Sequence, residues 1–522
     1  MAFMNAIKNE LNNETKLTEN GAVGYRTTGK KLLDLNFSVA SLRGASEQTI
    51  INKFMDAYWE DPVMAIKWLF YTRDCREGLG ERRLFRIVLK HLAQDKPEVI
   101  KAVFAFAPIY GRYDDLWCLL DTELKQGVIF AVAAQLSEDR TNMKNGKSIS
   151  LLGKWLPSEN ASSKETKRHA TIIRKGLDMT SRNYRKMLSG LRKHIKVVEC
   201  KMSAKQWNEI DYEAVPSRAN LIYNNAFLRN DEERRRAYLG ALEKGETKIN
   251  AGTLFPHDIV HKYASCGWYS RLGNYDAALE GMWKALPDTV KGNGNTLVVA
   301  DGSGSMTCNV GSGTSVTALD VANALAIYFA ERASGEFKDK YITFSERPQF
   351  VDFSNAKTLR DKIGIALSHN EVANTNIEAV FDLILQTAVN NHMAQEDIPT
   401  NILIISDMEF DSCATSGAPT SRNGWYVGYA SQRPTATLFD TIAKKYATHG
   451  YKLPRLVFWN VNSRTGTIPV KENDLGVALV SGFSVNIVNM VMSNKLDPYE
   501  CLLDALNVER YQAIEDAIRS IV

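Results

Sequence analysis

The sequence predicts a multidomain protein in which an α-helical solenoid precedes an α/β domain with a doubly wound sheet. Helical periodicity runs from about residue 46 to residue 286, and short apolar strands alternate with helices from about residue 291. The chain of 522 residues also exceeds the usual size of one domain. We therefore expect a helical repeat domain at 1–290 and an α/β domain at 291–522.

The helical part opens with a recognisable start signal. Asp61 is a good N-cap, and Pro62 suits the first helical position after it. Apolar residues then recur on one helical face, and a turn with two glycines at 78–80 leads to a second helix. A third helix starts near Pro97. The spacing of paired helices predicts a solenoid, although no strict sequence repeat supports it.

The second part alternates between strand and helix patterns. Strands are expected at 296–300, 341–344, 350–353, 401–405 and 455–459, and helices at 317–333, 376–390 and 437–446. This alternation is typical of a mostly parallel sheet with helices on both faces. The glycine-rich residues 292–294 are the expected linker between the two parts, and 411–434 is an expected loop.

An oxygen-rich loop follows the first of these strands. The sequence Asp301-Gly302-Ser303-Gly304-Ser305 comes directly after the apolar run 296–300. One carboxylate and two hydroxyls on alternate residues suit a hard divalent cation, which prefers oxygen ligands. Open α/β sheets bind their ligands at this carboxyl edge. The few carboxylates favour Mg²⁺ over Mn²⁺ and Ca²⁺.

This D-x-S-x-S loop resembles the start of the metal-ion-dependent adhesion site of von Willebrand factor A (vWA) domains. Thr375 and Asp407 match the second-loop threonine and the third-loop aspartate of that family. The resemblance implies a metal site formed by Asp301, Ser303, Ser305, Thr375 and Asp407. It also implies that a protein partner supplies a carboxylate to the bound ion. The third loop departs from the family pattern, because Met408 stands where glycine is usual.

Several enzyme classes are not supported by the sequence. Phosphotransferases with an aspartyl nucleophile carry a second Asp two residues after the first, where this chain has Ser303. No HExxH, GxSxG or P-loop pattern and no Cys/His pairing occur in the chain. We therefore expect a binding protein and not an enzyme.

Positive charge is concentrated in residues 161–200, called the basic cluster here. This segment holds eleven Lys and Arg residues and three acidic ones, a net charge of +8, so the remaining chain carries −4 against a total of +4. Such a concentration is typical of a surface that binds a phosphate backbone. It also fits a solvated helical face of long side chains, and the charge alone leaves both interpretations open.

The helical part resembles the Ro autoantigen (TROVE) family. Residues 71–82 are similar to its R-D-x-R-x-G-x-G-E-R motif, and residues 110–116 to its G-R-x-D-D segment. Together with a vWA domain, and with the motif at 152–158, the pattern is similar to the plant, bacterial and phage branch of the family. Because opposite charges are interleaved around two glycines, a structural role for residues 73–82 is favoured over a role in binding.

The resemblance implies HEAT-like repeats closed into a ring, with structured RNA on a basic outer surface and single-stranded 3′ ends of misfolded RNA in the hole. We expect the following residues to contact phosphates: Arg174, Lys175, Arg182, Arg185, Lys186, Arg192 and Lys193. The alternative is a metal-dependent protein-interaction scaffold, in a viral or cellular assembly, that binds no RNA.

Cysteine usage and hydropathy predict a cytoplasmic location. Seven scattered cysteines form no CxxC pair, which fits reduced thiols better than a disulfide framework or a zinc site. We expect no membrane partner, because no apolar run approaches the length of a membrane span. The polar residues 1–16 do not resemble a signal peptide.

Overall fold

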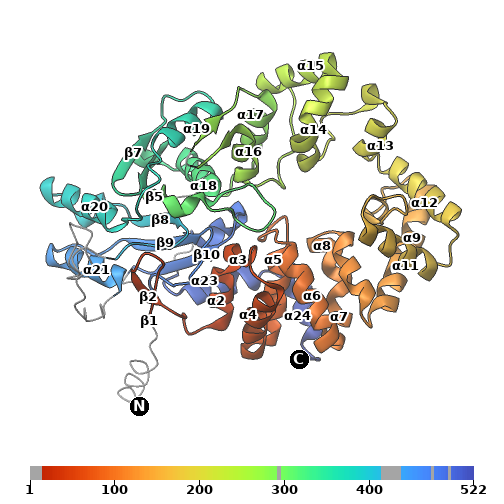
Figure 1. Ribbon diagram of the computed structural model, residues 1–522, viewed down its shortest axis with the longest axis horizontal. Coiled ribbons are helices and arrows are strands. Elements are labelled where there is room, and N and C mark those ends of the chain that lie inside the picture. The colour runs from red at the N-terminus through yellow and green to blue at the C-terminus, as the bar shows by residue number, and fades with distance from the viewer. Residues whose placement is uncertain (1–14, 268, 291–294, 413–436, 472–474, 492–494) are drawn as a thin grey trace, which may run out of the picture. The chain divides into compact units, whose positions relative to one another are not determined.

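The computed structural model of the protein describes residues 15–267, 269–290, 295–412, 437–471, 475–491 and 495–522 (Figure 1). The chain forms two compact units that are interleaved in sequence: Met1–Ser46 with Phe255–Ala505, and Glu47–Leu254 with Leu506–Val522. The sequence predicts two consecutive domains, 1–290 and 291–522, whereas each observed unit includes a segment from the far end of the chain. The expected linker at 292–294 and most of the expected loop at 411–434 lie outside the described residues.

The second of these units, called the helical unit, consists of α-helices and short 3-10 turns. Its α-helices are α4 (Glu47–Glu60), α5 (Pro62–Arg73), α6 (Arg83–Asp95), α7 (Pro97–Val103), α8 (Ala107–Tyr110), α9 (Lys125–Lys144), α10 (Leu152–Trp155), α11 (Lys164–Gly176), α12 (Ser181–His194), α13 (Val198–Ser203), α14 (Ser217–Asn230), α15 (Glu232–Glu243) and α24 (Gln512–Ile518). The 3-10 turn η2 (Tyr113–Asp121) joins α8 to α9. As predicted, α5 starts at Pro62, and the Asp61 carboxylate accepts a hydrogen bond of 2.9 Å from the Met64 amide.

The other unit, called the α/β unit, contains all the described strands (Figure 1). The strands are β1 (Thr15–Leu17), β2 (Val23–Tyr25), β3 (Ala264–Ser265), β4 (Arg271–Leu272), β5 (Thr296–Asp301), β6 (Lys340–Phe344), β7 (Pro348–Asp352), β8 (Asn401–Ser406), β9 (Arg455–Asn460) and β10 (Val477–Ser481). The helices are α2 (Lys31–Phe37), α3 (Val39–Leu42), α16 (Pro256–Tyr263), α17 (Ala277–Lys284), α18 (Ala318–Arg332), α19 (Leu359–Ser368), α20 (Glu378–Asn390), α21 (Leu438–Thr448), α22 (Val488–Val491) and α23 (Pro498–Leu506).

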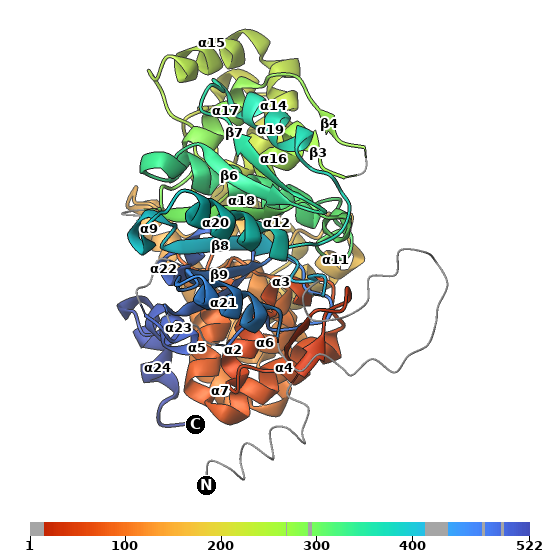
Figure 2. The same ribbon diagram turned by 90° about the vertical axis from the view of Figure 1, so that its left-hand side faces the viewer.

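Six strands form the main sheet in the order β10-β9-β8-β5-β6-β7. All neighbours are parallel except β6 and β7, which pair antiparallel. Counted along the chain from β5, this is the doubly wound order 3-2-1-4-5-6. Strands β5, β9 and β10 are buried along their whole length, as expected for strands covered on both faces. Helices α20 and α21 lie side by side at one flank (Figure 1 and Figure 2).

Residues 71–82 and 110–116 of the helical unit meet in one ion-pair cluster. The Asp115 carboxylate is fully buried and accepts hydrogen bonds of 2.7 Å from both Arg73 and Arg86. Gly111 lies against this pair, where a Cβ atom would collide with the side chains of Asp115 and Arg73. The cluster therefore joins helices α5 and α6 to η2, which agrees with the structural role favoured for residues 73–82.

The C-terminal segment supplies further partners to α5. Lys67 is fully buried, and its ammonium group lies 2.7 Å from both the Glu515 carboxylate and the Asn507 side chain. The Asp74 carboxylate pairs with Arg510 and accepts a hydrogen bond of 3.0 Å from the Tyr511 hydroxyl. Residues near the C-terminus thus complete the charge pairing of the first helices in the helical unit.

We expect replacement of Asp115 by Asn to destabilise the helical unit by about 3 kcal/mol, because the buried Arg73 guanidinium group would lose its counter-charge and the partly exposed Arg86 would keep only Asp114. The neighbouring Asp114 is the matched control, since it pairs with Arg86 but is partly exposed. The Asp114→Asn change should cost less than about 1 kcal/mol. Urea unfolding of both variants measures the difference, and equal losses would contradict the assigned role of Asp115.

Candidate functional site

Polar residues gather where β5 and β8 end, at the carboxyl edge of the sheet, which we call the crest. Asp301 is the last residue of β5, and Ser406 is the last residue of the neighbouring parallel strand β8, with Asp407 directly after it. The strand order reverses between β5 and β8, so the crest is a topological switch point. The apolar strands therefore bring two carboxylates, far apart in sequence, to one point.

Asp301 is held by the two loops that meet at the crest. One carboxylate oxygen accepts a hydrogen bond of 2.9 Å from the Ser303 amide, and the other accepts one of 2.6 Å from the Ser406 hydroxyl. The Ser303 and Ser305 hydroxyl oxygens lie 3.2 Å apart. Asp301 and Ser303 are both buried. The structure thus groups the three predicted residues of the first loop around one carboxylate.

Asp407 is also buried, and a single guanidinium group from the described part of the chain approaches it. The Arg464 Nη2 atom lies 3.4 Å from one Asp407 oxygen, and the Glu409 amide donates a hydrogen bond of 3.2 Å to the other. Burial raises the pKa of Asp407, and the charge of Asp301 raises it further, while the Ser305 hydroxyl and Arg464 oppose the shift. Asp407 therefore belongs to the same electrostatic group as Asp301 and Ser305.

Thr375, the fifth predicted residue, is buried beside a third carboxylate. Its amide donates a hydrogen bond of 3.0 Å to Asp411, and its hydroxyl accepts one of 3.2 Å from the Asn20 side chain. Burial raises the pKa of Asp301, and the charge of Asp411 adds to that effect. Asp411 therefore connects the Thr375 loop electrostatically with the other loops of the crest.

The donor set of the crest fits a hard divalent cation. Asp301 and Asp407 are two buried carboxylates whose pKa values are both raised, so their charges are incompletely balanced by protein groups. Buried charges of this kind are normally paired or bound to a metal ion. Three hydroxyls, from Ser303, Ser305 and Thr375, add neutral oxygen donors. Among the described residues, no group of three or more His, Cys, Asp or Glu is placed so that it could hold a metal ion.

In the third loop, Met408 stands where glycine is usual, and the structure shows how the loop is held in place. Met408 is buried and has φ of +62°, the left-handed conformation for which glycine is better suited. The next residue, Glu409, is fully buried, and its carboxylate accepts hydrogen bonds of 2.8 Å from the amides of Glu19, Arg464 and Thr465. Sequence analysis did not single out Glu409, although its position two residues after Asp407 placed it at the crest.

The seven predicted RNA-binding residues differ in how their side chains are used. Arg174 pairs with Glu159 at 2.8 Å and donates to the Met179 carbonyl. Arg192 donates to the carbonyls of Gly153 and Leu156 at 3.0 and 2.8 Å. These two guanidinium groups are engaged within the helical unit. The other five residues are exposed: Lys175, Arg182, Arg185, Lys186 and Lys193.

Four of the exposed residues lie on one face of α12, which we call the basic stripe: Arg182, Arg185, Lys186 and Lys193. Their spacing of three, four and eleven residues places them on one side of a helix with 3.6 residues per turn. Tyr184, Leu188 and Leu191 are buried on the opposite side. The stripe is therefore a solvent-facing positive surface that is backed by a packed apolar face.

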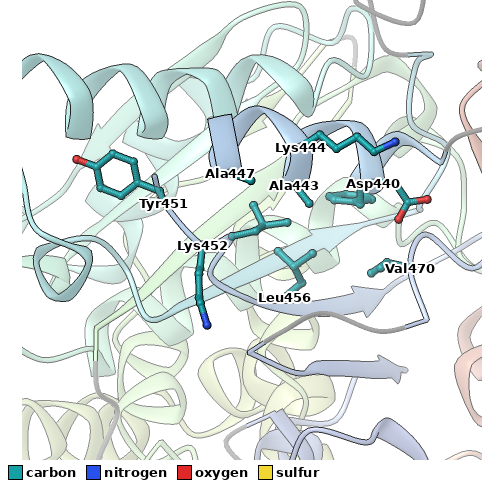
Figure 3. Close-up of a pocket in the computed structure, with 10 residues that line it drawn as sticks. Asp440, Ala443, Lys444, Ala447, Tyr451, Lys452, Leu456 and Val470 are labelled. Carbon is teal, nitrogen blue, oxygen red and sulfur yellow. The ribbon is translucent and has the colours of Figure 1, made fainter. Parts of the chain in front are cut away.

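A separate groove of about 490 Å³ runs along α21 (Figure 3). Residues Asp440, Ala443, Lys444 and Ala447 of α21 line one side, and the floor includes Leu453, Leu456 and Val470. The Tyr451 hydroxyl points away from the groove and donates to the Met393 carbonyl at 2.6 Å. None of the predicted site residues lines this groove, so it is distinct from the crest.

We expect the protein to lose stability as pH rises when a chelator removes divalent cations. The folded-state pKa values of Asp301 and Asp407 lie above the ordinary value of about 4, so protonation stabilises the fold. This contribution is fully present below about pH 4 and is lost as pH rises through about 6 for Asp301 and about 7 for Asp407. Thermal melts between pH 4 and 8 measure the trend. The Asp407→Asn variant should show a flatter profile, and an unchanged profile would contradict this explanation.

No helix among the described residues combines the length and the apolar character needed to cross a membrane.

Two family models match the chain. The model DUF2828, described as a domain of unknown function, matches residues 18–105 and 159–296. The model DUF7788, with the same description, matches residues 295–515. The two models meet at residues 295–296, directly before β5.

One relative and one solved structure extend this comparison. The crystal structure of the Deinococcus radiodurans RO (RSR) protein aligns with 93% of this chain and 93% of its own, with a TM-score of 0.32 and 13% identity, too weak a likeness to assign fold or function. Uncharacterized protein L728 of Acanthamoeba polyphaga mimivirus is 30% identical over 531 residues, which cover 94% of this chain and 86% of the relative. Identity of this extent places the chain in the same protein family as mimivirus L728.

Proposed function

We propose that this chain is a Ro-like RNA-binding protein that carries a vWA-type divalent-cation site at the crest of its α/β unit. The basic stripe on α12 is the observation that carries the RNA part of the proposal. The buried carboxylates of Asp301 and Asp407, grouped with three hydroxyl side chains, support the cation site. Mg²⁺ is the ion that suits such a set best.

The proposed cation site is suited to binding and not to hydrolysis. Asp301 is held by the Ser303 amide and the Ser406 hydroxyl, which fixes its carboxylate as a ligand. In vWA domains, the open coordination position of the ion takes a carboxylate from a partner, and we propose the same use here. The partner would be a protein with an exposed Asp or Glu.

The basic stripe suits phosphate contacts that do not depend on base sequence. Long cationic side chains on an exposed helical face neutralise backbone charge and release counterions. The resemblance of residues 71–82 and 110–116 to the Ro family favours RNA over DNA as the ligand. Asp115 of the second segment accepts hydrogen bonds from Arg73 of the first segment and from Arg86. This contact supports the interpretation that the two segments are a structural signature of the Ro family.

An alternative function is a metal-dependent protein-interaction scaffold that binds no RNA. The crest would serve this function equally well, because none of its residues belongs to the basic cluster. The stripe favours RNA binding, since four cations on one exposed face lack the interleaved acids of a salt-bridged helix. A direct RNA-binding measurement distinguishes the two functions.

We expect Mg²⁺ to stabilise the protein, by about 2.7 kcal/mol at a hundredfold excess over its Kd. The Asp301→Asn variant should lose this effect and still fold, because the Ser406 hydroxyl can accept as well as donate a hydrogen bond. Thermal melts with Mg²⁺ and with a chelator test both statements. The Glu336→Gln variant, which changes an exposed residue of the same unit, is the control. Equal Mg²⁺ stabilisation of Asp301→Asn and the unsubstituted protein would exclude the proposed site.

We expect RNA affinity to fall steeply with salt, and this dependence should weaken when Arg182, Lys186 and Lys193 are changed to Gln. Each lost phosphate contact lowers the slope of log K against log salt by about 0.7 for single-stranded RNA, so the triple variant should lose about 2. Fluorescence anisotropy with a labelled RNA measures the slope. The melting temperature should change little, because these side chains are exposed.

The matched control replaces Lys101, Lys244 and Lys248, three exposed lysines of the helical unit outside the basic cluster, by Gln. This variant has the same net charge as the stripe variant, so it separates a local contact from a general effect of charge. A similar loss of slope in both variants would contradict the choice of α12. Absence of RNA binding by the unsubstituted protein at low salt would favour the scaffold function.

A further inference from the structure

The turn that joins β1 to β2 lies directly on the crest. In this turn, Thr18 donates a hydrogen bond of 2.6 Å to the Phe410 carbonyl, and the Asn20 side chain donates to Thr375 at 3.2 Å and to the Glu409 carbonyl at 2.6 Å. Between them, Glu19 extends a carboxylate that is about half exposed, 55%. A segment near the N-terminus thus contacts two of the three loops that hold the predicted metal ligands.

The Glu19 carboxylate pairs with Arg464, the one guanidinium group among the described residues that approaches Asp407. The Arg464 Nη2 atom lies 2.6 Å from Glu19 and 3.4 Å from Asp407. The contact with Glu19 is therefore a short ion pair, whereas the contact with Asp407 is a long hydrogen bond that Arg464 donates. Arg464 is therefore shared between the two carboxylates, and its Nη2 atom lies nearer to the more exposed one.

This arrangement is fixed by the backbone and is not a chance contact of two long side chains. The buried Glu409 carboxylate accepts hydrogen bonds of 2.8 Å from the amides of both Glu19 and Arg464. The same carboxylate binds the Thr465 amide and hydroxyl at 2.8 and 3.0 Å. One buried acid therefore holds the backbones of Glu19 and Arg464 next to each other at the crest.

We propose that Glu19 is a positioning residue that holds Arg464 away from Asp407 and so keeps the crest open to a divalent cation. This inference rests on the proposed cation site and adds a regulatory contact to it. A guanidinium group and a metal ion compete for the same buried carboxylate, because both neutralise its charge. Arg464 therefore competes with the cation for Asp407, and Glu19 in the β1–β2 turn controls the position of the Arg464 side chain.

The proposal gives opposite signs for two single substitutions. The Glu19→Gln change removes the outer counter-charge, so Arg464 pairs with Asp407 and opposes the cation. The Arg464→Gln change removes the competitor itself. We expect Mg²⁺ affinity to fall about fivefold to tenfold in Glu19→Gln and to rise by a similar factor in Arg464→Gln.

The double variant decides whether Glu19 acts through Arg464. In the Arg464→Gln background, Glu19→Gln should leave Mg²⁺ affinity unchanged, since no guanidinium group remains to be positioned. Isothermal calorimetry with MgCl₂ on the full chain measures all four affinities, and melts in chelator check that each variant folds. Asp504→Asn, which removes the partner of Lys495 on the same unit, is the control for loss of an exposed ion pair.

Three results would overturn the proposal. Unchanged Mg²⁺ affinity in Glu19→Gln would remove the role of Glu19. An equal loss in both backgrounds would show that Glu19 acts on the ion directly and not through Arg464. Lower affinity in Arg464→Gln would show that Arg464 assists the cation. If the unsubstituted chain binds no Mg²⁺, the proposed cation site fails and this inference fails with it, an outcome distinct from the other three.

Discussion

Two carboxylates buried side by side at the ends of parallel strands are the constraint on which the crest is built. Asp301 and Asp407 end up together because β5 and β8 are neighbours at the switch point of the sheet. Like charges in a buried place repel, so the surrounding groups are donors: the Ser303 amide, the Ser406 hydroxyl and the Arg464 guanidinium. A bound cation would complete the same electrostatic balance.

The sequence predicted five of the six strands of the main sheet, all but β10, because these strands depend on local patterns. Apolar runs of five residues define β5, β8 and β9, and polar residues follow them directly. The β1–β2 hairpin and its contact with the crest could not be predicted, because a short polar turn has no period and its partners lie hundreds of residues away. For the same reason Arg464 gave no signal as a partner of Asp407.

Counting charges along the sequence identified the basic cluster, but it could not show which of its side chains are exposed and which bind other groups of the protein. Arg174 and Arg192 serve as internal ties to carbonyl and carboxylate groups, whereas the basic stripe faces solvent. The difference follows from helical phase: the stripe lies opposite Tyr184 and Leu191, while Arg192 is next to a buried residue and reaches back to Gly153. Along α12, the position of each Lys or Arg around the helix axis relative to the buried face could therefore have distinguished exposed side chains from those that bind other protein groups.

The interleaving of the two units has a consequence for synthesis on the ribosome. Lys67 and Asp74 are made long before their partners Glu515 and Arg510, which follow them by 448 and 436 residues. Until then α5 exposes a cation and an anion that the finished unit buries. Domains usually fold in order of emergence, yet here the helical unit must wait until the segment Leu506–Val522 has been made. A nascent chain that stalls before Leu506 would therefore carry an incomplete helical unit, which is a natural substrate for chaperones.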